Sequence, residues 1–137
     1  MSGTSDLPTL LANLAPVVSP QVYVFLSRPH ATYGAGAELD PIATFAEKEG
    51  LTLIVPKERA DEARAEYEGE YALISLSVHS DLQAVGLTAA IAGVLTERGI
   101  SANIVAAFYH DHLFVPLPRV DDALAALSRL ATDNSSP

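Results

Sequence analysis

The chain contains no cysteine among its 137 residues. Neither a disulfide nor a thiolate metal site can therefore form. This composition suits a reducing compartment, and we expect a cytoplasmic location. No stretch reaches the roughly 18 uninterrupted apolar residues that a membrane span requires. The first ten residues also lack the basic segment of a signal peptide. We therefore expect no membrane association.

Basic residues are few. Eight lysines and arginines stand against 17 aspartates and glutamates, which gives a net charge of −9. Proteins that bind nucleic acid gain most of their affinity by neutralising phosphates, so we expect no nucleic-acid partner. Hydrophobic residues make up 49% of the chain, which is too apolar for a disordered protein. The length is enough for one folded domain with a substantial core.

The second half of the chain has the clearest pattern. It predicts a strand at 71–78, a helix capped by Ser80 or Asp81 and ended by Gly99, two strands, and a closing helix with apolar residues from Val120 to Leu130 at helical spacing. This order is that of a split βαβ unit without its final strand.

The first half predicts a short helix capped near Asp6, strands at 22–27 and 51–56, and a charged helix that Gly69 ends. The segment 42–50 is compatible with one helical turn or an irregular edge. We therefore expect an α+β fold, a ferredoxin-like βαββαβ sandwich of two imperfect halves. These halves, 1–70 and 71–137, would share the strand around 71–78 and form one compact domain. The alternative is a chance likeness, because such sandwiches are common.

The topology of a split βαβ unit predicts where three of the four histidines lie. The end of its first strand and the hairpin between its second and third strands meet at the same edge of the sheet. The sequences VHSD (78–81) and YHDH (109–112) should therefore converge. Both should lie near the start of the helix that we expect from about Leu82, whose free N–H groups favour a carboxylate.

The ACT-domain superfamily is resembled by one long stretch, VHSDLQAVGLTAAIAGVLTERGISANIVAAFYHDHLFVP. A second stretch, EKEGLTLIVPKERA, is similar to the first half of the small stand-alone bacterial members of that superfamily, whose function is largely unassigned. The resemblance spans roughly residues 7 to 130. It implies a regulatory protein that binds a small molecule, most often an amino acid, and that pairs through its sheet, here as a homodimer. We expect no attached enzyme or DNA-binding domain.

The resemblance also implies where the ligand lies, namely by the loop between the first strand and the first helix. Asn103 matches an asparagine that contacts the ligand across an interface in some relatives, and it would act only from a neighbouring domain. The expected ligand-binding residues are His79, Ser80, Asp81, Leu82, Val85, Gly86, Asn103, His110, Asp111 and His112.

Other interpretations of these residues stay open. His79 suits a structural hydrogen bond, Ser80 a helix cap, and the HDH stretch a tight turn that Asp111 stabilises. Imidazole and carboxylate groups also suit a metal ion, so a small metal-binding protein or enzyme that uses His79, His110 and His112 is an alternative. A protein-interaction module is another. We expect no cofactor, no resident metal and no catalytic residue.

Overall fold

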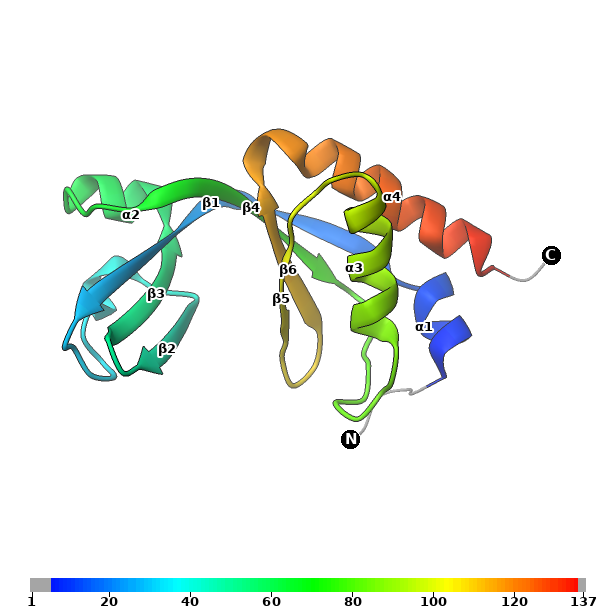
Figure 1. The fold of residues 1–137 in the computed structure, drawn as a ribbon, viewed down its shortest axis with the longest axis horizontal. Helices are drawn as coiled ribbons and strands as arrows, with labels where there is room; N and C mark the ends of the chain where they lie inside the picture. Colours follow the sequence, from blue (N-terminus) through cyan, green and yellow to red (C-terminus); the bar gives the residue numbers. More distant parts are fainter. Residues whose placement is uncertain (1–5, 136–137) are drawn as a thin grey trace. The chain divides into compact units, whose positions relative to one another are not determined.

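The computed structural model describes residues 6–135 (Figure 1). Its strands follow the order β2-β3-β1-β4-β6-β5 in a six-stranded sheet. The ladders β1–β3, β2–β3 and β5–β6 are antiparallel. The elements, in chain order, are α1 (Leu7–Ala12), β1 (Pro16–Pro29), the 3-10 turn η1 (Ala37–Leu39), β2 (Ala43–Glu47), β3 (Gly50–Pro56), α2 (Lys57–Glu62), β4 (Glu68–Leu76), α3 (Leu87–Glu97), β5 (Asn103–Ala106), β6 (Asp111–Pro116), the 3-10 turn η2 (Leu117–Arg119) and α4 (Val120–Asp133).

The chain forms two compact units. The terminal unit consists of the described residues 6–19 and 72–135, and the central unit consists of residues 20–71. The α+β class and the two repeated halves are as predicted, and β4 is divided between the units as the shared strand. The sequence did not show that β1 is divided in the same way. The prediction that the second half lacks a final strand of its own is confirmed within the described residues, where no strand follows α4; β1 of the first half lies next to β4 in the sheet order instead.

The terminal unit is held together by one apolar core. Leu87, Ile91 and Leu95 of α3 recur every four residues and are buried, as helical periodicity requires. They pack with Ile74 of β4 and Leu113 of β6. Helices α1, α3 and α4 contact one another. The N-terminal segment joins this unit because Leu10 and Leu14 are fully buried in the same core.

Helix α3 begins at Leu87, five residues after the predicted start. The expectation that Ser80 or Asp81 caps this helix is wrong. Asp81 instead closes a turn: its Oδ1 accepts the Gln83 N–H at 2.8 Å, and its carbonyl accepts the Ala84 N–H at 2.9 Å. Short polar side chains compete with helical hydrogen bonds in this way. The chain enters α3 through Gly86, which has a left-handed φ of 96°.

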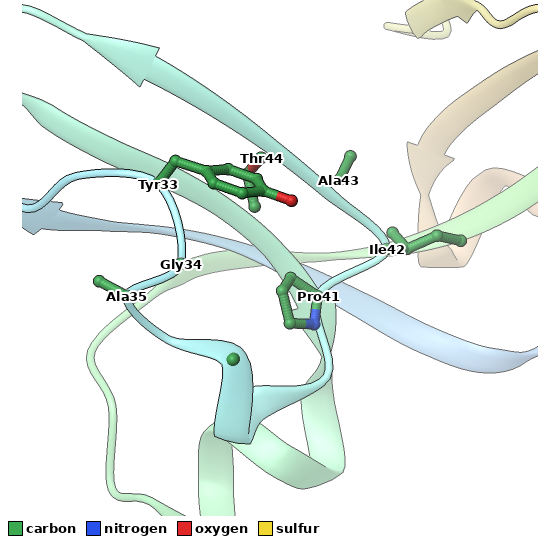
Figure 2. A pocket seen from close by; sticks show the side chains of 8 residues that line it. Tyr33, Gly34, Ala35, Pro41, Ile42, Ala43 and Thr44 are labelled. Carbon is green, nitrogen blue, oxygen red and sulfur yellow. The ribbon is translucent and has the colours of Figure 1, made fainter.

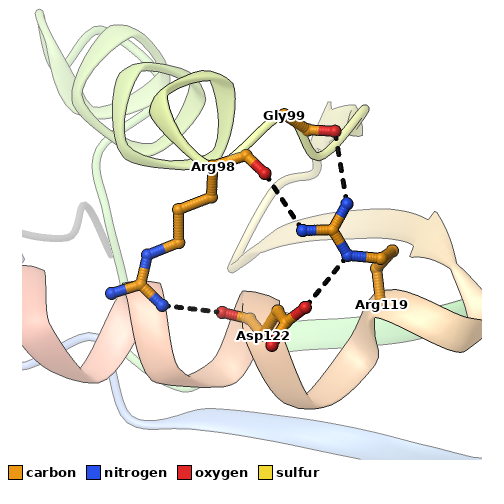
Figure 3. Close-up of polar contacts among 4 residues, drawn as sticks. All are labelled: Arg98, Gly99, Arg119 and Asp122. Carbon is orange, nitrogen blue, oxygen red and sulfur yellow. Dashed lines mark hydrogen bonds and ion pairs between the residues drawn. The ribbon is translucent and has the colours of Figure 1, made fainter.

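The end of α3 is fixed by Arg119 (Figure 3). Its guanidinium donates to the carbonyls of Arg98 at 3.0 Å and Gly99 at 3.4 Å, and to the Asp122 carboxylate at 3.0 Å. The last carbonyls of a helix have no partner within it, so these bonds satisfy groups that would otherwise need water. The start of α4 and the end of α3 are thereby joined.

The central unit has a smaller core of its own, which includes Val24, Leu51, Leu53 and Val55. The segment 43–47 forms the strand β2, where one helical turn or an irregular edge had been the expectation. Helix α2 ends at Glu62 rather than near Gly69, because the chain turns at Arg64, whose φ is 54°. The loop 30–42 between β1 and β2 contains only the short turn η1 as helical structure.

Two glycines of the α3 region test this account of the helix start. A Cβ on Gly86 would stand in the left-handed region and 3.0 Å from a side-chain carbon of Leu7. We expect Gly86→Ala to lower the free energy of unfolding by about 1–2 kcal/mol. Gly93 lies inside α3 with open space around it. Gly93→Ala should raise stability by up to about 1 kcal/mol, because alanine favours helix.

Urea unfolding of both variants and the parent would measure the difference. An equal effect of the two substitutions would contradict the placement of Gly86 at the helix entrance.

Candidate functional site

The two predicted loop segments meet in the terminal unit. The Ser80 hydroxyl donates to the Asp111 carboxylate at 2.9 Å, and both residues are buried. A second contact joins the same segments, because His110 Nδ1 lies 3.2 Å from the Val78 carbonyl oxygen. We call this place the Ser80–Asp111 junction. The predicted convergence of residues 78–81 with residues 109–112 is therefore present in the structure.

The rings of His79, Tyr109 and His110 lie close to one another beside the junction. The ring centroids of His79 and His110 are 6.3 Å apart, and those of His79 and Tyr109 are 5.4 Å apart. Tyr109 is exposed, whereas His79 and His110 are half-buried. The junction thus places a buried carboxylate, one hydroxyl and two imidazoles together. Such groups can bind both a cationic and an anionic part of one small molecule.

His112 lies on a different face of the sheet. The tight turn covers residues 107–110, with the Ala107 N–H donating to the His110 carbonyl at 3.0 Å, so Asp111 and His112 belong to β6 rather than to the turn. Successive side chains of a strand point to opposite faces. His112 therefore points to the opposite face from Asp111, where its Nδ1 lies 2.7 Å from the Ser75 hydroxyl and its ring centroid lies 6.5 Å from that of His110.

The remaining predicted residues make none of the contacts that join the junction. Asp81 forms the turn described above, and Leu82 and Val85 are 58% and 83% exposed in the segment before α3. The prediction that a helix begins near Leu82 and offers its N–H groups there is wrong. Asn103 is exposed at the start of β5, the last strand in the sheet order.

Metal binding was the chemical alternative for this cluster. Within residues 6–135, no group of three or more histidine, aspartate or glutamate side chains is arranged to hold a metal ion. None of the helices in this range is both long and apolar enough to cross a bilayer.

A hollow of about 360 Å³ lies elsewhere, in the central unit (Figure 2). It is formed by the loop 33–37 and the segment 41–44, and none of the predicted site residues lines it. Sequence reasoning missed it because YGAGAELDP has the glycines and proline of an ordinary loop. The available signal was the tyrosine between two small residues, which the structure leaves 86% exposed.

Together, the two units define an α+β protein built from ferredoxin-like repeats. The chain belongs to the ACT-domain family: two family models described as ACT domain match residues 2–72 and 68–129. ACT domains are typically regulatory modules that bind ligands. Among curated proteins, no sequence matches this chain.

Solved structures show the same fold. A Vibrio cholerae protein of unknown function, described as a possible transport protein, is 44% identical; the match covers 93% of this chain and 97% of that one, with a TM-score of 0.83. The ligand-free regulatory subunit of aspartate kinase from Thermus thermophilus is 14% identical over 87% of this chain and 98% of that one, with a TM-score of 0.61. A protein from Agrobacterium tumefaciens is 17% identical over 80% and 81%, with a TM-score of 0.64.

The environment of His112 predicts a pH dependence of stability. Burial lowers the pKa of His112 from its ordinary value of 6.5, and the nearby His110 adds to this effect. The folded state therefore favours the neutral ring, so this contribution to stability is complete above pH 6.5 and is lost as the pH falls below it. We expect the urea concentration at the unfolding midpoint of the parent to decrease when the pH is lowered from 8 to 5. This decrease should be smaller in His112→Gln. An unchanged fall in the variant would contradict this assignment.

Proposed function

We propose that this protein is a regulatory ACT-domain module that binds an amino acid at the Ser80–Asp111 junction. The buried carboxylate of Asp111, with only 4% of its surface exposed, is the observation that carries the proposal. A carboxylate removed from water is costly unless it is paired. Ser80 supplies one hydrogen bond, and the α-ammonium group of a ligand would supply a charged partner.

The rest of the amino acid finds matching chemistry close by. The half-buried ring of His79 carries an N–H group that can donate to an α-carboxylate, whereas the Nδ1–H of His110 already meets the Val78 carbonyl. The exposed Leu82 and Val85 offer apolar surface to a side chain of the ligand. Family membership supports a ligand of this size, because ACT domains are typically ligand-binding modules.

Substitution of Asp111 tests the proposed contact. In a calorimetric screen of the twenty amino acids, we expect at least one to bind the parent. Asp111→Asn should weaken that binding by about 10-fold or more, because a hydrogen bond to a charged group contributes roughly 1.5–3 kcal/mol. The amide can still accept the Ser80 hydroxyl, so the fold should survive.

Asp121→Asn is the matched control, since it removes one aspartate charge from an exposed position in the first turn of α4. It should bind like the parent. No binding by any amino acid, or equal binding by Asp111→Asn, would refute the proposal.

We also propose that the protein forms a homodimer through sheet edges. Strands β2 and β5 end the sheet order, and exposed apolar side chains lie on them, with Phe45 at 71% and Val105 at 42% exposure. Unpaired strand edges are sites where a second chain can pair. Pairing at β5 is also the way in which Asn103 would reach the ligand of a neighbouring copy.

The mass in solution checks this second proposal. Light scattering at micromolar concentration should show a species of twice the 14.4 kDa chain mass. A species of 14.4 kDa alone would contradict it.

A further inference from the structure

The hollow in the central unit has the dimensions of a small-molecule site. Its volume of about 360 Å³ lies in the range of about 300–1,000 Å³ that ligand pockets occupy. In Figure 2 the ring of Tyr33 extends toward Ala43 and Ile42, with Pro41 below it. The residues that line the hollow are Tyr33, Gly34, Ala35, Ala37, Pro41, Ile42, Ala43 and Thr44.

The lining carries no charged side chain. Its polar side-chain groups are the hydroxyls of Tyr33 and Thr44, and the other side chains are apolar or absent. A charged ligand would lose hydration here without gaining a counter-charge. An uncharged ligand would lose much less. The exposed ring of Tyr33 offers a flat face to a planar molecule, and stacked rings attract each other beyond the burial of area.

The loop that forms the hollow is held in place from three sides. Gly36 has a left-handed φ of 83°, and a Cβ at that position would clash with the side chain of Leu53, so the loop packs closely on β3. Leu39 of η1 is only 2% exposed and belongs to the core of the central unit. Glu38 is held by Arg28 and Arg59. These contacts hold the loop in the shape that forms the hollow.

Two arginines fix Glu38. Its carboxylate forms a 2.8 Å ion pair with Arg28, and its carbonyl accepts a hydrogen bond from Arg59 at 3.4 Å. The hydrogen bonds from its own backbone and from Arg28 lower the pKa of the Glu38 carboxyl. Asp40, one residue beyond η1, stands at a φ of 55°, which a non-glycine residue adopts only at a cost. Strain of this kind persists where the surroundings fix the conformation.

We propose that this hollow is a second binding site, distinct from the Ser80–Asp111 junction, and that it takes a small, flat, uncharged heteroaromatic or aromatic-amide ligand. The ligand stacks on Tyr33, and its polar edge bonds to the Thr44 hydroxyl and to backbone groups of the loop. The site does not take an amino-acid zwitterion, because nothing in the lining compensates either charge.

Three molecules of one size but different charge test the proposal directly. Benzamide is neutral, benzoate is an anion and benzylamine is a cation. In an NMR titration of the full chain, benzamide should shift amides of residues 33–44 and leave those of 79–86 and 107–112 unchanged. Benzoate and benzylamine should bind at least about 10-fold more weakly, since burial of an unpaired charge is penalised.

Tyr33→Ala supplies the site-specific test. It should weaken benzamide binding by about 5-fold or more, because it removes the ring on which the ligand stacks. Phe108→Ala is the control: it removes an exposed aromatic ring of the terminal unit, and it should bind benzamide like the parent. Amino-acid binding at the junction should survive in Tyr33→Ala, which separates failure here from failure of the proposed function.

Three results would overturn the inference. The first is that benzoate binds as tightly as benzamide, and the second is that Tyr33→Ala binds benzamide like the parent. The third is that no amide of 33–44 shifts up to 10 mM benzamide, a concentration that corresponds to a binding free energy on the order of 3 kcal/mol. Shifts at 33–44 that depend on protein concentration without ligand would also overturn it, since a second copy would then fill the hollow.

Discussion

The hydrogen bond between Ser80 and Asp111 is the contact on which the candidate site depends. It joins the loop after β4 to the start of β6, across 31 positions of sequence. Because both partners are buried, neither can be removed without exposing or orphaning the other. The position of His110 follows from the same arrangement, since its ring meets the carbonyl of Val78 in that loop. A ligand bound here would contact two segments whose geometry is already set.

The two units differ in the chemistry that they offer. The junction in the terminal unit combines a carboxylate with imidazoles, which suits a ligand that carries charges of both signs. The hollow in the central unit is neutral, and its polar groups are hydroxyls and backbone. Each unit repeats one topology with a different loop after its first strand, so the repeat supplies a frame and the loops supply specificity. The two proposed sites therefore suit two chemically unrelated molecules.

Much of the fold followed from the sequence because its signals are local. Leu124 and Leu127 mark α4 by helical spacing, and the strand at 71–78 was visible from its apolar and β-branched residues. The convergence of VHSD with YHDH needed only the order of elements and the rules of strand connection. The start of α3 was mispredicted because Ser80 and Asp81 resemble a cap; Asp81 instead closes a turn, and Ser80 bonds across the unit to Asp111.

The sequence by itself indicated the α+β class, the repeat and a histidine-rich edge, since each rests on periodicity or spacing along the chain, and it indicated the family through its resemblance to ACT domains. Tertiary structure decided which groups share a space. It put residues 6–19 into the terminal unit, because Leu10 and Leu14 find their apolar partners there. It turned His112 toward Ser75 and Asp111 toward Ser80, because strand register assigns neighbouring side chains to opposite faces. It also formed the hollow beside Tyr33, because that shape depends on how Gly36 and Leu39 pack on β3, a contact that no local pattern encodes.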